Sequence, residues 1–169
     1  DELLVFNNKG RVFSLKVWEL PEGSRTSKGQ AIINLINIEG EERVQAILPL
    51  GKEDLDKKDT YLFFTTRQGT VKKTLLSQYA NIKSNGLIAI NLTKKDQLVW
   101  VNQTSGDHHI LLVTRDGKSI RFKESDVRAT KRDTMGVRGI SLKKDDFCVS
   151  LECFTSNQVK FKDKRKNAF

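Results

Sequence analysis

Residues 60–92, TYLFFTTRQGTVKKTLLSQYANIKSNGLIAINL, contain the pattern from which the fold is predicted, because it occurs three times in the chain. The earlier copy spans residues 1–35, DELLVFNNKGRVFSLKVWELPEGSRTSKGQAIINL, and the later copy spans residues 109–142, HILLVTRDGKSIRFKESDVRATKRDTMGVRGISL. Each copy begins with a short apolar run and then reaches a turn glycine, which is Gly10, Gly69 or Gly117. Regular internal repetition on this scale indicates an array of similar structural units.

The turn glycines separate runs that have the character of β-strands. Apolar runs precede them at residues 3–6, 62–64 and 110–113, and further strand-like runs follow at residues 12–16, 71–74 and 119–123. Glycine adopts the positive φ angles that tight hairpin turns require. We therefore expect each unit to begin with a β-hairpin.

A second glycine follows 17 to 19 residues later, at Gly29, Gly86 or Gly136. After it, apolar and small polar residues alternate, which predicts a third strand around Ile33–Asn34–Leu35, Ile90–Asn91–Leu92 and Ile140–Ser141–Leu142. A fourth strand is expected at residues 44–48, 98–101 and 149–154. Ten residues past each turn glycine stand Leu20, Tyr79 and Val127, which we expect to anchor the excursion between the second and third strands.

Four short strands in about 50 residues match one blade of a propeller. The sequence thus predicts an all-β, propeller-like array of about three four-stranded blades, at residues 1–50, 60–104 and 108–155, within one domain of residues 1–155. The Lys-rich residues 156–169 are expected to form an exposed tail. Closed propellers usually have about 4–8 blades, so we expect these units to belong to a larger ring.

Positive charge is concentrated in one part of each unit. The chain of 169 residues has 30 Lys and Arg against 21 Asp and Glu, a net charge of +9, which favours a polyanionic partner. The windows 9–28, 67–85 and 115–138 hold 17 basic and 6 acidic residues, whereas the rest of the chain holds 13 and 15. Because these windows are equivalent in the repeat, we expect them to align along one edge of the array.

A row of Lys and Arg neutralises the phosphates of duplex DNA and releases counterions. No recognition helix is evident, so we expect little sequence specificity, and the aromatic content of 8% disfavours a stacking platform for single strands. The candidate phosphate contacts are Arg11, Lys16, Arg25, Lys28, Arg67, Lys72, Lys73, Lys83, Lys118, Arg121, Lys123, Arg128, Lys131, Arg132 and Arg138.

The sequence offers no catalytic or metal-binding constellation. It lacks a P-loop, a zinc-protease helix motif and a Ser/His/Asp set, and the adjacent His108 and His109 fall in an expected turn. Cys148 and Cys153 are interpreted as small buried or half-buried hydrophobes, and we expect no metal site and no cofactor in this chain. No apolar run approaches the ~18 residues of a membrane span, so we expect no membrane partner. Low cysteine content and the lack of an export signal favour a cytoplasmic location.

Three stretches carry a family resemblance: GRVFSLKVWELPEGSRTSKGQAIINL, GTVKKTLLSQYANIKSNGLIAINL and GKSIRFKESDVRATKRDTMGVRGISL. Together they resemble the C-terminal domain of the A subunit of DNA gyrase and its relative in topoisomerase IV, over about residues 1–154. The resemblance implies a six-bladed β-pinwheel that wraps duplex DNA around a basic rim. It also implies a chromosome-associated heterotetramer, in which an ATPase subunit joins the cleavage core that the same polypeptide carries.

In this family the cleavage tyrosine, ATP and Mg²⁺ belong to other domains or subunits, so the resemblance implies that this chain alone is not an enzyme. Tyr61 and Tyr79, its only tyrosines, occupy positions that look structural. The family's glutamine-arginine-glycine-rich box is missing, the segment Ala129–Thr130–Lys131 departs from the usual methionine-glycine, and residues 157–169 do not match. The LPE and GVRG stretches look more like gyrase than like topoisomerase IV.

Two other interpretations stay open at this point. A basic propeller scaffold that binds an acidic protein partner would share the charge pattern and the salt sensitivity. A hydrolase or lyase built on a propeller would need a polar, acid-lined central funnel, which the repeat does not indicate.

Overall fold

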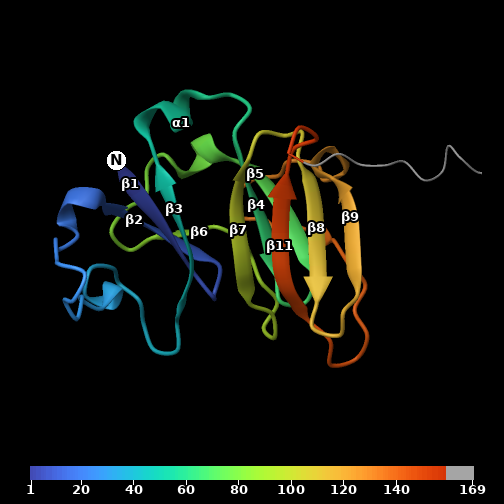
Figure 1. The fold of residues 1–169 in the computed structure, drawn as a ribbon, viewed down its shortest axis with the longest axis horizontal. Helices are drawn as coiled ribbons and strands as arrows, with labels where there is room; N and C mark the ends of the chain where they lie inside the picture. Colours follow the sequence, from blue (N-terminus) through green and yellow to red (C-terminus); the bar gives the residue numbers. More distant parts are fainter. Residues whose placement is uncertain (159–169) are drawn as a thin grey trace, which may run out of the picture.

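The computed structural model describes residues 1–158 and contains three antiparallel β-sheets that stand side by side (Figure 1). Its strands are β1 (Glu2–Asn7), β2 (Arg11–Lys16), β3 (Val44–Leu50), β4 (Tyr61–Thr66), β5 (Thr70–Leu75), β6 (Leu87–Ile88), β7 (Leu98–Thr104), β8 (His109–Thr114), β9 (Ser119–Lys123), β10 (Val137–Arg138) and β11 (Cys148–Phe154). The all-β, propeller-like architecture predicted from the repeat is confirmed.

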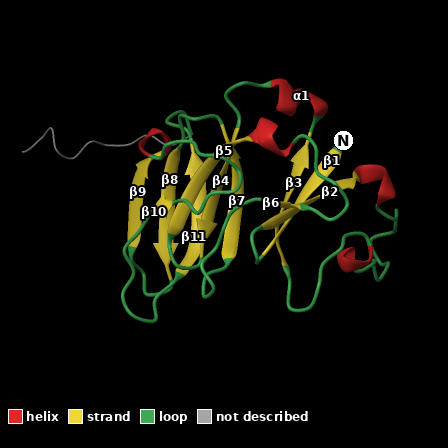
Figure 2. Ribbon diagram, turned by 180° about the vertical axis from the view of Figure 1, so that it is seen from behind, coloured by secondary structure: helices red, strands yellow, loops and turns green. Residues whose placement is uncertain are grey.

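Helical segments are short. They comprise the α-helix α1 (Lys52–Asp56) and the 3-10 helices η1 (Val17–Glu19), η2 (Ile32–Asn34), η3 (Leu76–Tyr79) and η4 (Glu124–Asp126). Figure 2 shows them at the periphery of the sheets. Across residues 1–158, no helix has the length and apolar character needed to span a membrane.

Each unit begins with the predicted hairpin, and its last strand pairs with the first strand of that hairpin. The sheet orders are β3-β1-β2-β6, β10-β5-β4-β7 and β11-β8-β9. The predicted fourth strands are therefore confirmed as β3, β7 and β11. The first two sheets have four strands each, and the third has three within the described residues.

In each four-stranded sheet, one of the two edge strands comes from the following unit. Strand β6 of the second unit pairs with β2 of the first, with Arg11 opposite Ile88, and β10 of the third unit pairs with β5 of the second, with Val137 opposite Val71. The units are thus interlocked, since each of these two sheets is completed by its successor.

The expected third strands around residues 33–35, 90–92 and 140–142 are wrong. Residues 32–34 form η2, and Ile90 and Ile140 lie outside any strand. The amides of Ala89 and Ile90 both donate to the carbonyl oxygen of Gly10, at 2.8 and 3.1 Å, and the amides of Gly139 and Ile140 donate to that of Gly69 in the same way, at 2.8 and 3.3 Å. The alternation of apolar and polar residues therefore reflects packing against the turn of the preceding unit. Strands β6 and β10 end two residues before Ile90 and Ile140.

The turn glycines are required by this close approach. Gly10 and Gly69 have φ angles of +80° and +81°, and a Cβ on Gly10 would lie only 2.5 Å from the carbonyl oxygen of Ile90. A Cβ on Gly69 would lie 2.8 Å from Cγ2 of Ile140. A side chain at either position would push the two units apart.

The core lies between the sheets. On β4, the neighbouring residues Phe63 and Phe64 face opposite ways, so that Phe64 packs toward the first sheet and Phe63 toward the third. Phe64 meets Phe6 edge to face, with ring centroids 5.8 Å apart. Tyr79 and Val127 are buried in these two clusters, which confirms them as anchors, and Leu20 packs against a third cluster on the other face of the first sheet.

Both cysteines are free, and Cys148 is buried while Cys153 is half-buried, as predicted. Burial raises the pKa of each thiol to about 11. The predicted exposed tail, residues 156–169, falls outside the described residues from residue 159 onward.

Candidate nucleic-acid interface

Most of the fifteen basic residues singled out by the sequence lie on the surface. Arg11 and Arg132 are half-buried, and Lys72 and Lys73 are buried. The exposed ones are Lys16, Arg25, Lys28, Arg67, Lys83, Lys118, Arg121, Lys123, Arg128, Lys131 and Arg138.

The outer edge of the first sheet gathers basic residues from two different units. Arg11 stands opposite Ile88 in the β2–β6 pair, and its guanidinium donates to the carbonyl oxygen of Asn85. From the third unit, Nη1 of Arg132 donates to the carbonyl oxygen of Ile88 at 2.7 Å. Two cations that lie far apart in the sequence are therefore held at the same edge of the first sheet.

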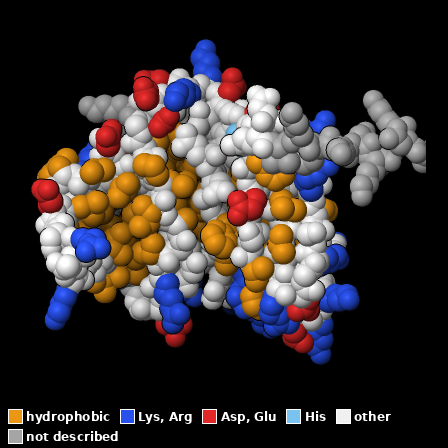
Figure 3. Space-filling model, viewed as in Figure 1, with side chains coloured by type: hydrophobic (Ala, Val, Ile, Leu, Met, Phe, Trp, Pro, Cys, Tyr) orange, Lys and Arg blue, Asp and Glu red, His pale blue; other side chains and the backbone are white. Residues whose placement is uncertain are grey.

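The edges of the other two sheets continue this surface. Arg138 lies on β10, the edge strand of the second sheet, and Arg121 and Lys123 lie on β9, the edge strand of the third. In Figure 3, Lys and Arg side chains gather along the border of the molecule over β9 in Figure 1. We call the exposed and half-buried cations on β2, β9 and β10 and in residues 128–132 the outer basic edge.

One acidic cluster lies on the short helix α1. Glu53, Asp54 and Asp56 belong to α1, at the end of the molecule where Figure 3 shows several Asp and Glu side chains. A hydrogen bond from Lys57 at 2.8 Å and one from the backbone amide of Gly51 lower the pKa of Asp54. Other acids lie among the basic residues, since Glu2 pairs with Lys16 and Oε1 of Glu42 lies 4.0 Å from Nη1 of Arg11.

Four exposed lysines beside the hairpin turns, Lys94, Lys95, Lys143 and Lys144, are missing from the sequence prediction. They follow Leu92 and Leu142 within three residues, so their recurrence was visible, but they fall outside the windows in which the positive charge is concentrated. Their signal in the sequence is a pair of lysines directly before an aspartate.

Two arginines from neighbouring turns share one aromatic ring. The guanidinium carbon of Arg67 lies 3.5 Å from the centroid of Phe147, and that of Arg115 lies 5.0 Å from it. These residues, with Lys95 and Lys143, line a depression of about 540 Å³ between the second and third units. Asp145 and Asp146 also line it, so the turn end offers a second surface on which four basic residues stand beside two acidic ones.

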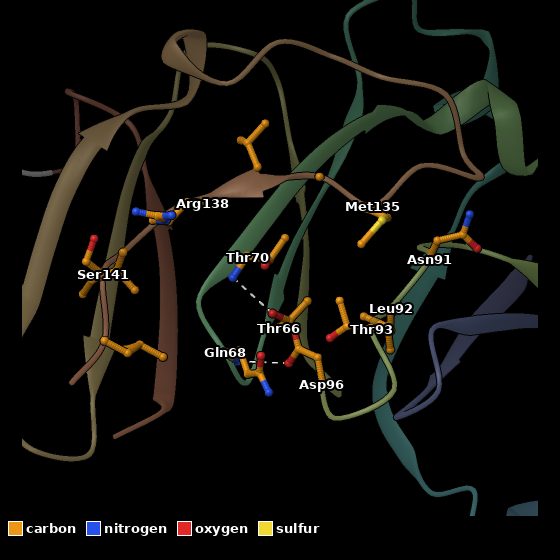
Figure 4. A pocket seen from close by; sticks show the side chains of 14 residues that line it. Thr66, Gln68, Thr70, Asn91, Leu92, Thr93, Asp96, Met135, Arg138 and Ser141 are labelled. Atoms are coloured by element: carbon orange, nitrogen blue, oxygen red, sulfur yellow. Dashed lines mark hydrogen bonds between the residues drawn. The ribbon is translucent and has the colours of Figure 1, made fainter. Parts of the chain in front are cut away.

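A polar pocket of about 350 Å³ separates the second and third units above the Gly69 turn (Figure 4). Arg138 and Ser141 lie on one side of it, and Asn91 lies on the other. Asp96 does not stand free in this pocket, because it accepts hydrogen bonds from the amides of Gln68 and Gln97, at 2.9 and 2.8 Å. Its carboxylate thus fixes the turn and leaves Arg138 as the charged group on the rim.

Burial stands against two of the predicted phosphate contacts. Lys72 is 1% exposed and Lys73 is 7% exposed. The cover comes from residues 124–132 of the third unit, the excursion between its second and third strands, which lies against β5. Desolvation is the main reason that the pKa of Lys72 is lowered to about 7; the charge of Asp133 opposes this shift and that of Arg132 adds to it. Both amines bond to backbone carbonyls, so they point into the protein and away from any ligand on the outer basic edge.

The tyrosines have packing roles. Tyr79 is buried, its hydroxyl donates to the carbonyl oxygen of Ala89 at 3.2 Å, and desolvation raises its pKa. The ring centroid of Tyr61 lies 5.1 Å from the amine of Lys73. These contacts support the structural interpretation of both residues.

Comparison with known proteins agrees with the fold and the repeat. A family model described as "DNA gyrase C-terminal domain, beta-propeller" matches residues 1–50, 60–105 and 108–155. The chain belongs to this family. The A subunit of DNA gyrase from Escherichia coli (strain K12) is 44% identical over 151 residues, and that from Halalkalibacterium halodurans is 48% identical over 139 residues.

These alignments cover 89% and 82% of this chain but only 17% and 16% of the relatives. Among solved structures, the C-terminal domain of DNA topoisomerase IV superposes with a TM-score of 0.83 at 38% identity, over 92% of this chain and 48% of that chain. A DNA gyrase A C-terminal domain superposes with a TM-score of 0.71 at 28% identity, over 89% and 47%. The described blades thus span about half of the solved domains.

Proposed function

We propose that this chain binds and bends duplex DNA along its outer basic edge without reading base sequence. The observation that carries the proposal is the meeting of cations from different units on the sheet edges, above all Arg11 and Arg132 at Ile88. Duplex DNA presents a phosphate charge about every 1.7 Å of its axis. A rigid row of cations that follows the edges of successive sheets suits such a ligand.

The lack of a recognition element supports binding without base readout. Base readout in the major groove usually needs a helix or a β-ribbon that enters it. Within residues 1–158 the longest helix is α1, which has five residues and is acidic. The phosphate backbone is therefore the part of DNA that this surface fits.

Within a longer protein, this module would support ATP-dependent negative supercoiling by a type IIA topoisomerase, a role that we infer from the relatives in DNA gyrase. Strand cleavage and the ATP and Mg²⁺ chemistry are assigned to other domains or subunits, and no catalytic role is assigned to this chain. The proposed partners are duplex DNA, the ATPase subunit of the parent enzyme and the cleavage core that the same polypeptide carries, in a chromosome-associated heterotetramer.

Topoisomerase IV remains the alternative parent enzyme, because the C-terminal domain of a topoisomerase IV superposes with a TM-score of 0.83. Both alternatives assign the same ligand to the outer basic edge. They differ in the topological product of the parent enzyme.

Binding is tested by fluorescence anisotropy with a mixed-sequence duplex, in competition with unlabelled duplex or polyglutamate. We expect duplexes of unrelated sequence to compete equally and polyglutamate to compete poorly. If about 6–10 phosphates are engaged, the affinity falls about 10³–10⁵-fold from 50 to 200 mM salt. Stronger competition by polyglutamate would favour an acidic protein partner, and a flat salt response would overturn the proposal.

Bending is tested separately, by ligating nicked circles with the chain bound and then separating the topoisomers. We expect the distribution of topoisomers to shift as the chain constrains the path of the duplex. An unchanged distribution would contradict bending and leave duplex binding without bending as the function.

A further inference from the structure

Lys72 and Lys73 are consecutive residues of β5 whose side chains leave opposite faces of the strand, and each bonds to the excursion of the next unit. Nζ of Lys72 donates to the carbonyl oxygens of Ala89, at 2.6 Å, and of Arg132. Nζ of Lys73 donates to the carbonyl oxygen of Glu124 at 3.1 Å. Both side chains are buried, so the two bonds to the third unit act as internal struts.

The backbone of the excursion follows the same strand. The amide of Thr130 donates to the carbonyl oxygen of Lys73 at 2.8 Å, and Ala129 forms a parallel bridge with Lys73. Further on, the amide of Arg132 donates to Oε1 of Gln78 at 2.8 Å. Residues 124–132 are therefore attached to the second unit at several points, two of which are the lysine amines.

This excursion presents part of the outer basic edge. Arg128 and Lys131 are exposed on it, and Arg132 is the residue whose side chain reaches Ile88. The other units have no lysine at the corresponding positions: three and four residues after the turn glycine they have Phe13 and Ser14, or Ile120 and Arg121. The lysine struts thus belong to the second sheet alone.

We propose that Lys72 and Lys73 are positioning residues for DNA binding: they hold residues 124–132 so that Arg128 and Lys131 face the duplex, and they make no phosphate contact themselves. This inference rests on the proposed function, because it gives the bonds between β5 and residues 124–132 a role in DNA binding. The two lysines, predicted from the sequence as phosphate contacts, are thereby assigned to hold the residues that make such contacts.

The geometry makes Lys72→Met a clean test. Methionine has a similar unbranched shape and is apolar, so it suits a buried site. The carbonyl of Ala89 keeps a partner in the hydroxyl of Tyr79, at 3.2 Å, whereas the carbonyl of Arg132 loses the bond from Lys72. The loss therefore falls on the excursion. Lys73→Met serves as the second variant, and Lys58→Gln, at an exposed lysine outside the outer basic edge, serves as the control.

The deciding measurement is a double-mutant cycle on duplex affinity, which combines Lys72→Met with Arg128→Gln and Lys131→Gln. If Lys72 acts through the excursion, its effect shrinks by at least half once Arg128 and Lys131 are neutralised, and the combined loss is smaller than the sum. Fully additive losses would overturn the inference, because a group that contacts phosphate directly acts independently of its neighbours.

Amide hydrogen exchange separates positioning from general destabilisation. We expect exchange of the amides of Thr130 and Arg132 to accelerate about tenfold in Lys72→Met or Lys73→Met, with little change at Phe6 and Leu112 in the two cores. Uniform acceleration, or none, would overturn the inference. If the unsubstituted chain binds no duplex, the proposed function fails. The exchange experiment still decides whether the two lysines hold residues 124–132 in place.

Discussion

The amine of Lys72 lies 2.6 Å from the carbonyl oxygen of Ala89, the residue whose own amide bonds to Gly10 in the turn of the first unit. A basic residue on β5 is thereby tied to the junction between the first two units and, through Arg132, to the third. The positive charge counted in the sequence thus has two uses, since part of it faces outward and part of it joins the units.

Burial of Lys72 predicts a pH-dependent stability. Its pKa is lowered to about 7 in the folded chain, against about 10.4 in the unfolded chain. Between these values the unfolded state holds a proton that the folded state has released, so the free energy of unfolding rises with pH, by at most about 1.4 kcal/mol per unit. Urea unfolding of the parent chain and Lys72→Met from pH 6 to pH 9.5 measures this contribution. We expect the parent chain to gain stability relative to Lys72→Met above pH 7, and a constant difference would contradict the prediction.

The turn glycines allow a matched comparison. Gly69 and Gly117 both have φ of +81°, but a Cβ would meet Ile140 at the first and nothing within 4 Å at the second. Alanine at Gly117 should cost about 1–2 kcal/mol for the backbone conformation alone. Alanine at Gly69 should cost about 1–3 kcal/mol more, because the units must move apart. Equal losses in chemical denaturation would show that the contact between units adds no constraint.

Glu124 predicts a stability loss of a different origin. Its carboxylate is fully buried and accepts hydrogen bonds from Oγ1 of Thr104 at 2.6 Å and from the amides of Gly106 and His108, at 3.0 and 3.2 Å. Glu124→Gln keeps an oxygen for the two amides but removes the charge that strengthens these hydrogen bonds, which should cost about 1.5–3 kcal/mol in urea unfolding. The exposed Glu152→Gln on β11 should change stability by less than about 0.5 kcal/mol. A loss at Glu124 as small as that of the control would show that these buried hydrogen bonds contribute little to stability.

Arg138 predicts the salt dependence of DNA binding. It is exposed on β10 at the rim of the polar pocket. If it contacts one phosphate, Arg138→Gln should reduce the slope of log affinity against log salt by about 0.9. Lys58→Gln, an exposed lysine close to the acidic α1, should leave the slope unchanged. An equal effect of both substitutions would mean that only net charge matters.

Much of the fold follows from the sequence. The turn glycines, the flanking apolar runs and the anchor residues Tyr79 and Val127 recur at fixed spacing, and strand formation and hairpin turns are local properties of such residues. The concentration of basic residues in one segment of every unit was likewise visible. The predicted third strands failed because the alternation of Ile90, Asn91 and Leu92 serves contacts with the turn of another unit, and such contacts leave no local mark that separates them from strand pairing.

Local sequence was enough to specify the unit, its hairpin and the excess of positive charge between its two glycines. The pairing of β6 with β2 and of β10 with β5 joins residues of different units, so the way in which one unit completes the sheet of another emerged only from the folded chain. Whether each lysine is exposed or buried was likewise decided only by the folded chain. Whether a side chain meets solvent depends on the segment that lies over it, and at Lys72 and Lys73 that segment comes from the next unit.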